Sequence, residues 1–385
     1  MLGTQATEVA LLVQAKQLTG SAFAVGLLGV AEVLPLVVFG LAGGVVADRF
    51  DRRAVLRWCE AGLGCCAALL TLNALASRPA AWPLYVITAL MMAVAATARP
   101  SQDATMPRII PRDLLTAASA LLSMSENVSV IAGAALGGVL AAGPGPQFVY
   151  GLDTASFVAS FGLLMLLGRV PAPAAADHLR GQRALRAGLR YAAGRRDLLG
   201  SYLADLAAMT LSYPNALFPF MATELHAAWS VGLMFAAPSV GAVAVTALSG
   251  WMGRVRRHGL AIALAAAGWG LAISGFGLAP DIGAALACLV AAGAADMVSG
   301  IFRDTLWNQT IPDTLRGRLA GVELLSYSVG PSAGQLRAGG VASLTTPRFS
   351  LVSGGLLCAG AVGLVCLALP AFTAYRAQPS GDPAG

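Results

Sequence analysis

Long runs of apolar residues are the feature of this chain that most restricts its fold. Eleven runs are long enough for a membrane-spanning helix, which needs roughly 20 mainly apolar residues. They cover Ala22–Ala47, Ala54–Ala76, Trp82–Ala98, Leu114–Ala142, Phe148–Gly168, Leu198–Phe220, Val231–Met252, Leu260–Leu278, Ile282–Phe302, Leu319–Leu344 and Phe349–Leu369. Only 11% of the residues are charged, whereas a soluble domain carries about a quarter. We therefore predict an all-α integral membrane protein.

The runs fall into two sets on either side of a basic stretch, Arg169–Arg196. Five runs precede it and six follow it, and the short apolar segment Met1–Val13 is interpreted as the remnant of a truncated first helix. This predicts two pseudo-symmetric six-helix bundles. The expected divisions are an N-terminal bundle (1–168), a cytoplasmic linker (169–197), a C-terminal bundle (198–372) and a cytoplasmic tail (373–385).

An internal repeat supports duplication of one bundle. The string QDATMPRIIP at Gln102–Pro111 aligns with RDTLWNQTIP at Arg303–Pro312, with Asp, Ile and Pro matched at one offset. Parallel repeats of six spans build one class of transporter, with the substrate site between the halves. The repeat therefore indicates transport.

Arginine clusters in alternate loops predict the orientation. They follow the spans that end near Ala47, Ala98, Met252 and Phe302, and they fill the central stretch. Short loops near spans retain positive charge on the cytoplasmic side, so we expect these loops and both termini to be cytoplasmic, in a bacterial inner membrane. The sequence pI near 9.2 is explained by these signals, and no nucleic-acid partner is expected.

One loop carries a recognisable motif. Gly44–Arg53 reads GVVADRFDRR and resembles the G-x-L-A-D-R-x-G-R-R motif between spans two and three of the major facilitator superfamily. Val46 and Asp51 depart from the pattern. The resemblance implies the major facilitator fold and a cytoplasmic latch between its halves. The latch residues would be Gly44, Asp48, Arg49, Arg52 and Arg53, with Arg99 either a partner for Asp48 or an ordinary loop arginine.

A second motif lies on the fifth span. Gly133–Gly138 reads GAALGG and resembles the G-P-x-x-G-G antiporter motif of the superfamily's export branch. Ala134 replaces the proline, so the helix need not kink there. Gly133, Gly137 and Gly138 are thus either an antiporter motif or ordinary small-residue packing between helices.

Longer strings resemble the enterobactin-exporter subgroup, whose relatives include macrolide-efflux proteins. They are LTGSAFAVGLLG (Leu18–Gly29), GLAGGVVADRFDRR (Gly40–Arg53), LDTASF (Leu152–Phe157), YLADL (Tyr202–Leu206), ALFPF (Ala216–Phe220) and PDTLRGRLAGV (Pro312–Val322). The resemblance covers nearly the whole chain. It implies efflux of a small molecule by a monomer.

Ionisable residues inside spans are rare, costly and commonly functional. The candidates for proton coupling or substrate binding are Glu32, Glu126, Asp153, Asp205, Asp296 and Arg337, with Glu8 added if its segment is embedded. Glu32 is preferred as proton carrier or as contact for a cationic cargo, because it lies mid-span, three residues before Pro35. Each of these residues could instead be structural, and Asp153 could pair with Arg337.

These features favour proton-driven secondary efflux of a small amphipathic molecule, such as a siderophore of the enterobactin type or a drug. Macrolide or multidrug efflux is one alternative, and a transport-dead membrane sensor or scaffold is another. The chain has no G-x-x-x-x-G-K-[ST] loop for ATP. Its three histidines fall in separate loops and its six cysteines lack metal-ligand spacing, so we expect no enzyme, cofactor or metal.

Overall fold

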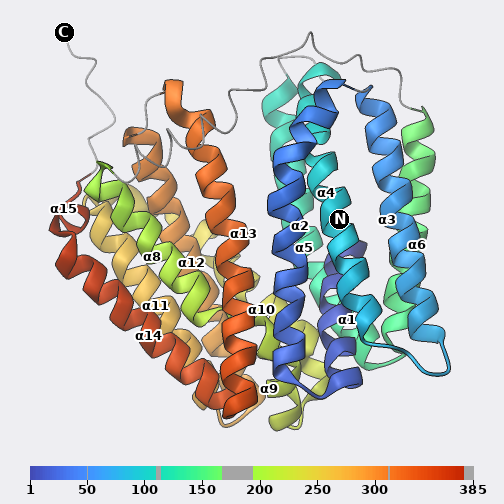
Figure 1. Cartoon of the computed structure of the whole chain (residues 1–385). Helices are drawn as coiled ribbons and strands as arrows, with labels where there is room; N and C mark the ends of the chain where they lie inside the picture. Colours follow the sequence, from blue (N-terminus) through green and yellow to red (C-terminus); the bar gives the residue numbers. More distant parts are fainter. Residues whose placement is uncertain (50, 110–113, 167–193, 311–312, 377–385) are drawn as a thin grey trace. The chain divides into compact units, whose positions relative to one another are not determined.

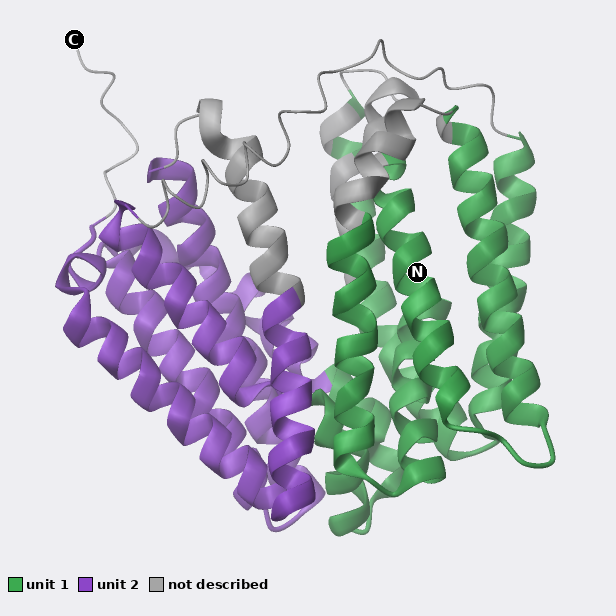
Figure 2. Ribbon diagram, in the orientation of Figure 1, with its two compact units in different colours: residues 1–179, 215–236 green, residues 180–214, 237–385 purple. Residues whose placement is uncertain are grey.

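The computed structural model describes residues 1–49, 51–109, 114–166, 194–310 and 313–376. Side chains at 40–49, 52, 100, 103–109, 115–116, 119–120, 123, 127 and 313–328 lie outside this description. The described elements are helices, and the chain groups into two compact units (Figures 1 and 2). Unit 1 comprises Met1–Leu179 and Asn215–Ala236, and unit 2 comprises Arg180–Pro214 and Ala237–Gly385. The sequence-based division instead assigns Asn215–Ala236 to the C-terminal bundle and separates a linker and a tail from the bundles.

The described part of unit 1 has six long helices. They are α1 (Leu2–Thr19), α2 (Ala22–Arg49), α3 (Arg52–Leu75), α4 (Trp82–Ile109), α5 (Leu115–Ala142) and α6 (Pro146–Leu166). The short helices η2 (Asn215–Leu217), α9 (Phe218–Glu224) and η3 (Ala228–Ser230) also belong to it, with the first residues of α10 (Val231–Ala247).

Unit 2 is built from a second series of helices. They are α8 (Arg196–Ser212), the remainder of α10, η4 (Ser249–Arg254), α11 (His258–Leu278), α12 (Ile282–Thr310), α13 (Asp313–Leu344), α14 (Pro347–Ala368) and α15 (Pro370–Thr373).

The two units repeat the same pattern of helix packing. In unit 1, α1 packs on α5 and α6, α3 packs on α4 and α6, and α5 packs on α6. In unit 2, α8 packs on α13 and α14, α11 packs on α12 and α14, and α13 packs on α14. If α8 is taken to correspond to α1, α11 to α3, α12 to α4, α13 to α5 and α14 to α6, each of these unit-2 contacts repeats a unit-1 contact. The predicted pseudo-symmetric, all-α membrane fold is thus confirmed.

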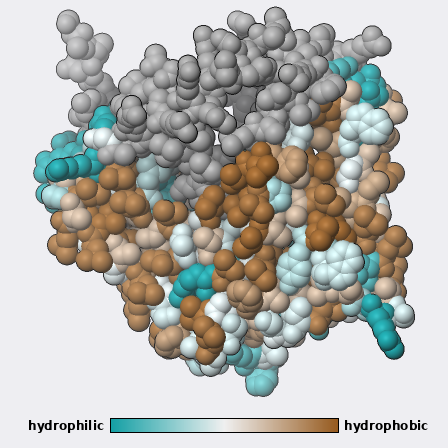
Figure 3. Space-filling view, in the orientation of Figure 1, coloured by the Kyte–Doolittle hydropathy of each residue, from teal (hydrophilic) through white to brown (hydrophobic). Residues whose placement is uncertain are grey.

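Large apolar side chains (brown) make up much of the described surface on the face shown in Figure 3. Trp58 on α3 is 79% exposed and Leu166 on α6 is 83% exposed. Soluble monomers rarely expose such continuous apolar surface, whereas acyl chains solvate it. Nine helices in the part of the chain that the structure describes are long and apolar enough to cross a membrane.

The predicted span Leu198–Phe220 is not one helix. Helix α8 ends at Ser212, and Tyr213 adopts an extended conformation with ψ of 118°. The cause is Pro214, because a proline disfavours helical geometry in the residue before it. The chain then continues through η2 and α9, which carries Pro219 in its first turn.

Several other helices differ in length from their apolar runs. Helix α1 continues to Thr19, beyond the predicted Met1–Val13 remnant, and ends at Gly20 in the left-handed conformation that glycine favours. Helices α4 and α12 extend past Ala98 and Phe302 to Ile109 and Thr310. Apolar windows stop at the first charged residues, but backbone hydrogen bonding continues through them. Residues predicted to be in loops, Arg303 among them, therefore lie within helices.

Candidate functional site

Two glutamates from neighbouring helices approach each other in unit 1. Glu8 lies on α1 and Glu32 on α2, and their carboxyl groups interact electrostatically. Both side chains are half-buried. Pro35, which lies inside α2, has no N–H to donate to the carbonyl of Ala31, so one helical hydrogen bond is missing next to Glu32. The pair is a polar site within two largely apolar helices.

The same helix α1 is tied to α6 by buried hydrogen bonds. The Thr7 hydroxyl donates to Asp153 Oδ2 at 2.8 Å, and the Tyr150 hydroxyl donates to Gln14 Oε1 at 2.8 Å. Asp153 also accepts a hydrogen bond from Ser156 at 3.3 Å and is fully buried. Asp153 is thus positioned to hold α1 against α6, since its hydrogen bonds satisfy a group that would be costly to bury alone.

Arg337, considered as a partner for Asp153, has its own partners in unit 2. Its guanidinium donates to the Ser350 carbonyl at 3.0 Å and to the Ser353 hydroxyl at 3.3 Å. These bonds join α13 to α14. The structure therefore gives Asp153 and Arg337 separate hydrogen-bonding partners.

The glycine motif on α5 provides close helix contacts. A side chain at Gly137 would overlap the backbone of Ala6 on α1, and one at Gly138 would overlap the backbone of Gly232 on α10. Gly133 likewise faces Leu2 and Gln5 of α1. Small residues permit such approach in membranes. These close approaches support the interpretation of the motif as small-residue packing between helices.

Replacing Gly138 with alanine is expected to destabilise the protein by about 1–3 kcal/mol, because the added methyl group forces two backbones apart. Gly151→Ala on α6 is the matched control, since a side chain there meets nothing within 4 Å. That control should be neutral or slightly stabilising through helix propensity. Thermal unfolding of the purified protein in detergent measures both, and equal melting temperatures would contradict the packing role.

A buried ion pair joins two helices of unit 2. Arg303 on α12 is paired with Asp205 on α8, and both side chains are only 3% exposed. Asp296, about two turns earlier on α12, interacts electrostatically with both groups. The Arg303 guanidinium also lies 5.5 Å from the centre of the Trp307 ring. Two of the predicted carboxylates, Asp205 and Asp296, are thus brought together by an arginine that was assigned to a loop.

Aromatic residues border this ion pair. Trp307 Nε1 donates to the Ser201 hydroxyl at 3.1 Å, and the Trp307 ring stacks on Tyr202 with ring centres 4.8 Å apart. Trp269 Nε1 of α11 donates to the Ser212 hydroxyl at 2.9 Å. These contacts connect α8 to α11 and α12, so α8 is held on one side by polar as well as apolar contacts.

Two of the remaining predicted residues are described and lie outside both polar clusters. Glu126 on α5 and Arg99 on α4 are exposed. In the latch motif, the side chains of Asp48, Arg49 and Arg52 and the surroundings of Gly44 lie outside the description. Arg53 donates to the carbonyls of Leu164 and Met165 at 3.4 and 2.6 Å. It thereby joins α3 to the last residues of α6.

The chain matches the family described as Transmembrane secretion effector over residues 1–383. It belongs to this family of the major facilitator superfamily. The resemblance drawn from the motifs is therefore confirmed.

Named relatives of this family member are exporters. The enterobactin exporter EntS of Citrobacter koseri is 30% identical over 96% of this chain and 89% of its own. The enterobactin exporter EntS of Escherichia coli O1:K1 is 29% identical over the same shares. The chain is accordingly a multi-pass transmembrane transporter of the major facilitator type and not an enzyme.

A solved structure shows the same fold for this family member. The inward-facing, unoccupied structure of a bacterial homolog of the human lysosomal transporter Spinster has a TM-score of 0.75. It covers 98% of this chain and 96% of that chain at 15% identity. At this identity the likeness shows the fold alone.

Two polar residues of this transporter were not among the predicted site residues. Arg303 was assigned to a basic loop because the apolar run ends one residue before it. Lys16, the only lysine, donates to the Pro219 carbonyl at 2.7 Å and to the Thr223 hydroxyl, and lies 5.1 Å from the Phe220 ring centre. It joins the end of α1 to α9. The sequence feature that could have identified Lys16 as a candidate is that it is the single lysine of an arginine-rich chain.

Proposed function

We propose that this transporter exports a siderophore across the bacterial inner membrane in exchange for protons, and that Glu32, with Glu8 beside it, carries the proton. The observation that carries the coupling proposal is the approach of these two carboxylates on α1 and α2. Two neighbouring carboxylates repel when both are ionised, and protonation of one relieves the repulsion. A pair of this kind is suited to take up one proton and release it.

The proton would follow a simple cycle. A proton that enters from the outer side binds the Glu32 carboxylate while the transporter is open outward. It leaves to the cytoplasm when access alternates, and the cargo moves outward in the opposite half of the cycle. Each proton that enters is therefore released on the other side, and the gradient drives cargo efflux.

The cargo class rests on the relatives rather than on the site. Both named relatives are enterobactin exporters and align with nearly the whole chain. One fold of this kind serves many cargoes, so the siderophore assignment needs a direct test.

The experiment is complementation of a siderophore-producing strain that lacks its own exporter. Expression of this chain is expected to restore siderophore in the medium, and a proton uncoupler is expected to stop secretion while the cellular siderophore level rises. A strain that carries the empty vector is the control. No restoration, with the protein present in the membrane, would contradict siderophore export. Macrolide accumulation assays would then decide whether drug efflux is the function.

A further inference from the structure

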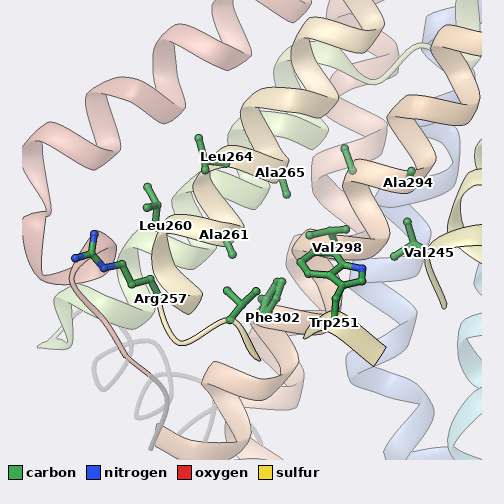
Figure 4. A pocket seen from close by; sticks show the side chains of 12 residues that line it. Val245, Trp251, Arg257, Leu260, Ala261, Leu264, Ala265, Ala294, Val298 and Phe302 are labelled. Carbon is green, nitrogen blue, oxygen red and sulfur yellow. The ribbon is translucent and has the colours of Figure 1, made fainter. Parts of the chain in front are cut away.

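Unit 2 has an apolar groove that the transport proposal does not use. The groove has a volume of about 500 Å³, within the range of roughly 300–1,000 Å³ found for ligand pockets. It lies between α11 and α12, next to the end of α10 and to η4. Figure 4 shows Leu260, Ala261, Leu264 and Ala265 following one another along α11, with Arg257 where this helix begins.

Small residues on two helices produce this hollow. Ala261 and Ala265 of α11 line the groove together with Ala294 and Ala295 of α12. Larger side chains at these positions would close the space, as they do in well-packed interiors. Leu264, on the same wall, is 65% exposed. The groove therefore opens onto the outer surface of the unit, where acyl chains are the solvent.

Positive charge surrounds one end of the groove. Arg257 lines it, and Arg254 and Arg256 lie in the same segment between η4 and α11; all three side chains are exposed. The ion pairs described in unit 2 use Arg195 and Arg303 instead. Helix α11 also begins here, so its positive dipole end adds to the charge.

The position of this end relative to the bilayer follows from the loop charges. The loop from Arg254 to Arg257 is one of the arginine clusters expected at the cytoplasmic surface. Trp251 on η4 is exposed beside it, and tryptophan is enriched at membrane interfaces. The cytoplasmic leaflet carries the anionic lipids.

We propose that the groove binds one anionic phospholipid of the inner leaflet. Its phosphate lies against Arg257, with Arg254 and Arg256 close by, and one acyl chain lies along Leu260, Leu264 and Val298. Charge complementarity selects the headgroup, and the hollow between the alanines retains the chain. This site is separate from the carboxylates proposed for proton transfer.

Native mass spectrometry of the full-length protein in detergent tests this proposal, with phosphatidylglycerol and phosphatidylcholine as probes. We expect phosphatidylglycerol to be retained in preference to phosphatidylcholine. Each arginine near an anionic surface contributes enough for about a fivefold change in affinity. Arg257→Gln should therefore weaken phosphatidylglycerol binding about fivefold, and the triple change at Arg254, Arg256 and Arg257 about 100-fold.

Two further variants separate a groove site from general lipid contact. Ala261→Trp fills the hollow and should remove the retained lipid, whereas Ala159→Trp on the exposed face of α6 should not. Arg78→Gln removes the same charge in another exposed loop and should leave binding unchanged. Equal binding of both lipids, or unchanged binding in Ala261→Trp and the triple variant, would overturn the proposal. Neither outcome bears on export, which is measured separately.

Discussion

Export is expected to fall to the vector background in Glu32→Gln while the amount of protein in the membrane stays normal. Glutamine has nearly the same shape and can keep the hydrogen bonds of a protonated glutamate, but it cannot release a proton. If the inward proton flow passes through this side chain, its neutral replacement carries no proton, and the gradient no longer drives efflux. The measurement is siderophore secretion normalised to transporter level.

Glu126→Gln is the matched control for that experiment. Glu126 is also a glutamate within a helix, but its side chain is exposed on α5 rather than half-buried beside another carboxylate. Its replacement should leave secretion close to that of the unaltered chain. Uncoupler-sensitive secretion by Glu32→Gln at the normal rate would remove Glu32 from the mechanism.

Exchange in proteoliposomes distinguishes proton transfer from cargo binding. Cargo-for-cargo exchange needs binding and alternating access but no net proton movement. If Glu32 serves only the proton, Glu32→Gln should still exchange labelled siderophore while losing accumulation driven by a pH gradient. Loss of both activities, with normal folding, would instead assign Glu32 to cargo recognition.

Replacing Arg303 with glutamine is expected to destabilise the protein by at least about 3–5 kcal/mol. This is the usual cost of removing one partner from a buried ion pair, because the other charge is left without compensation. Here the loss leaves two carboxylates, Asp205 and Asp296, near each other. Thermal or denaturant unfolding in detergent measures the effect.

The control for Arg303 is an arginine of the same unit with no buried role. Arg196 is exposed at the first turn of α8, where a positive charge is slightly unfavourable to the helix. Arg196→Gln should change stability by no more than about 0.5 kcal/mol.

A double variant tests the cause of the Arg303 effect. Adding Asp205→Asn to Arg303→Gln should recover part of the lost stability, because the unpaired carboxylate is removed as well. Strictly additive losses would mean that the arginine acts through its volume and its contact with Trp307 rather than through charge.

The helical membrane fold could be predicted from the sequence because its causes are local. Spans such as His258–Leu278 and Ile282–Thr310 are apolar over the length that crosses a bilayer, and every backbone group in lipid must be satisfied within its own helix. The end of α8 at Ser212 also has a local cause, Pro214. The sequence analysis nevertheless predicted one span over Leu198–Phe220 because this run is apolar throughout.

The candidate site could be predicted only by residue type. Glu32, Asp205 and Asp296 stood out because charged groups in apolar spans are rare. Their partners could not be predicted in the same way. Glu8 was a candidate only if its segment lay in the membrane, and Arg303 was assigned to a loop. Hydropathy windows end a span at a charge, whereas a charge with a partner is tolerated inside the helix.

The sequence by itself thus determined how many apolar segments the chain has, that they form helices, and which side chains are costly to bury in them. Tertiary structure decided the pairings: Glu8 with Glu32, Asp205 with Arg303, and Gly138 against Gly232. The physical reason is one of range. Hydrophobicity and backbone hydrogen bonding act along a single helix, but the partner that makes a buried charge stable comes from another helix, distant in the chain, and is set only by packing.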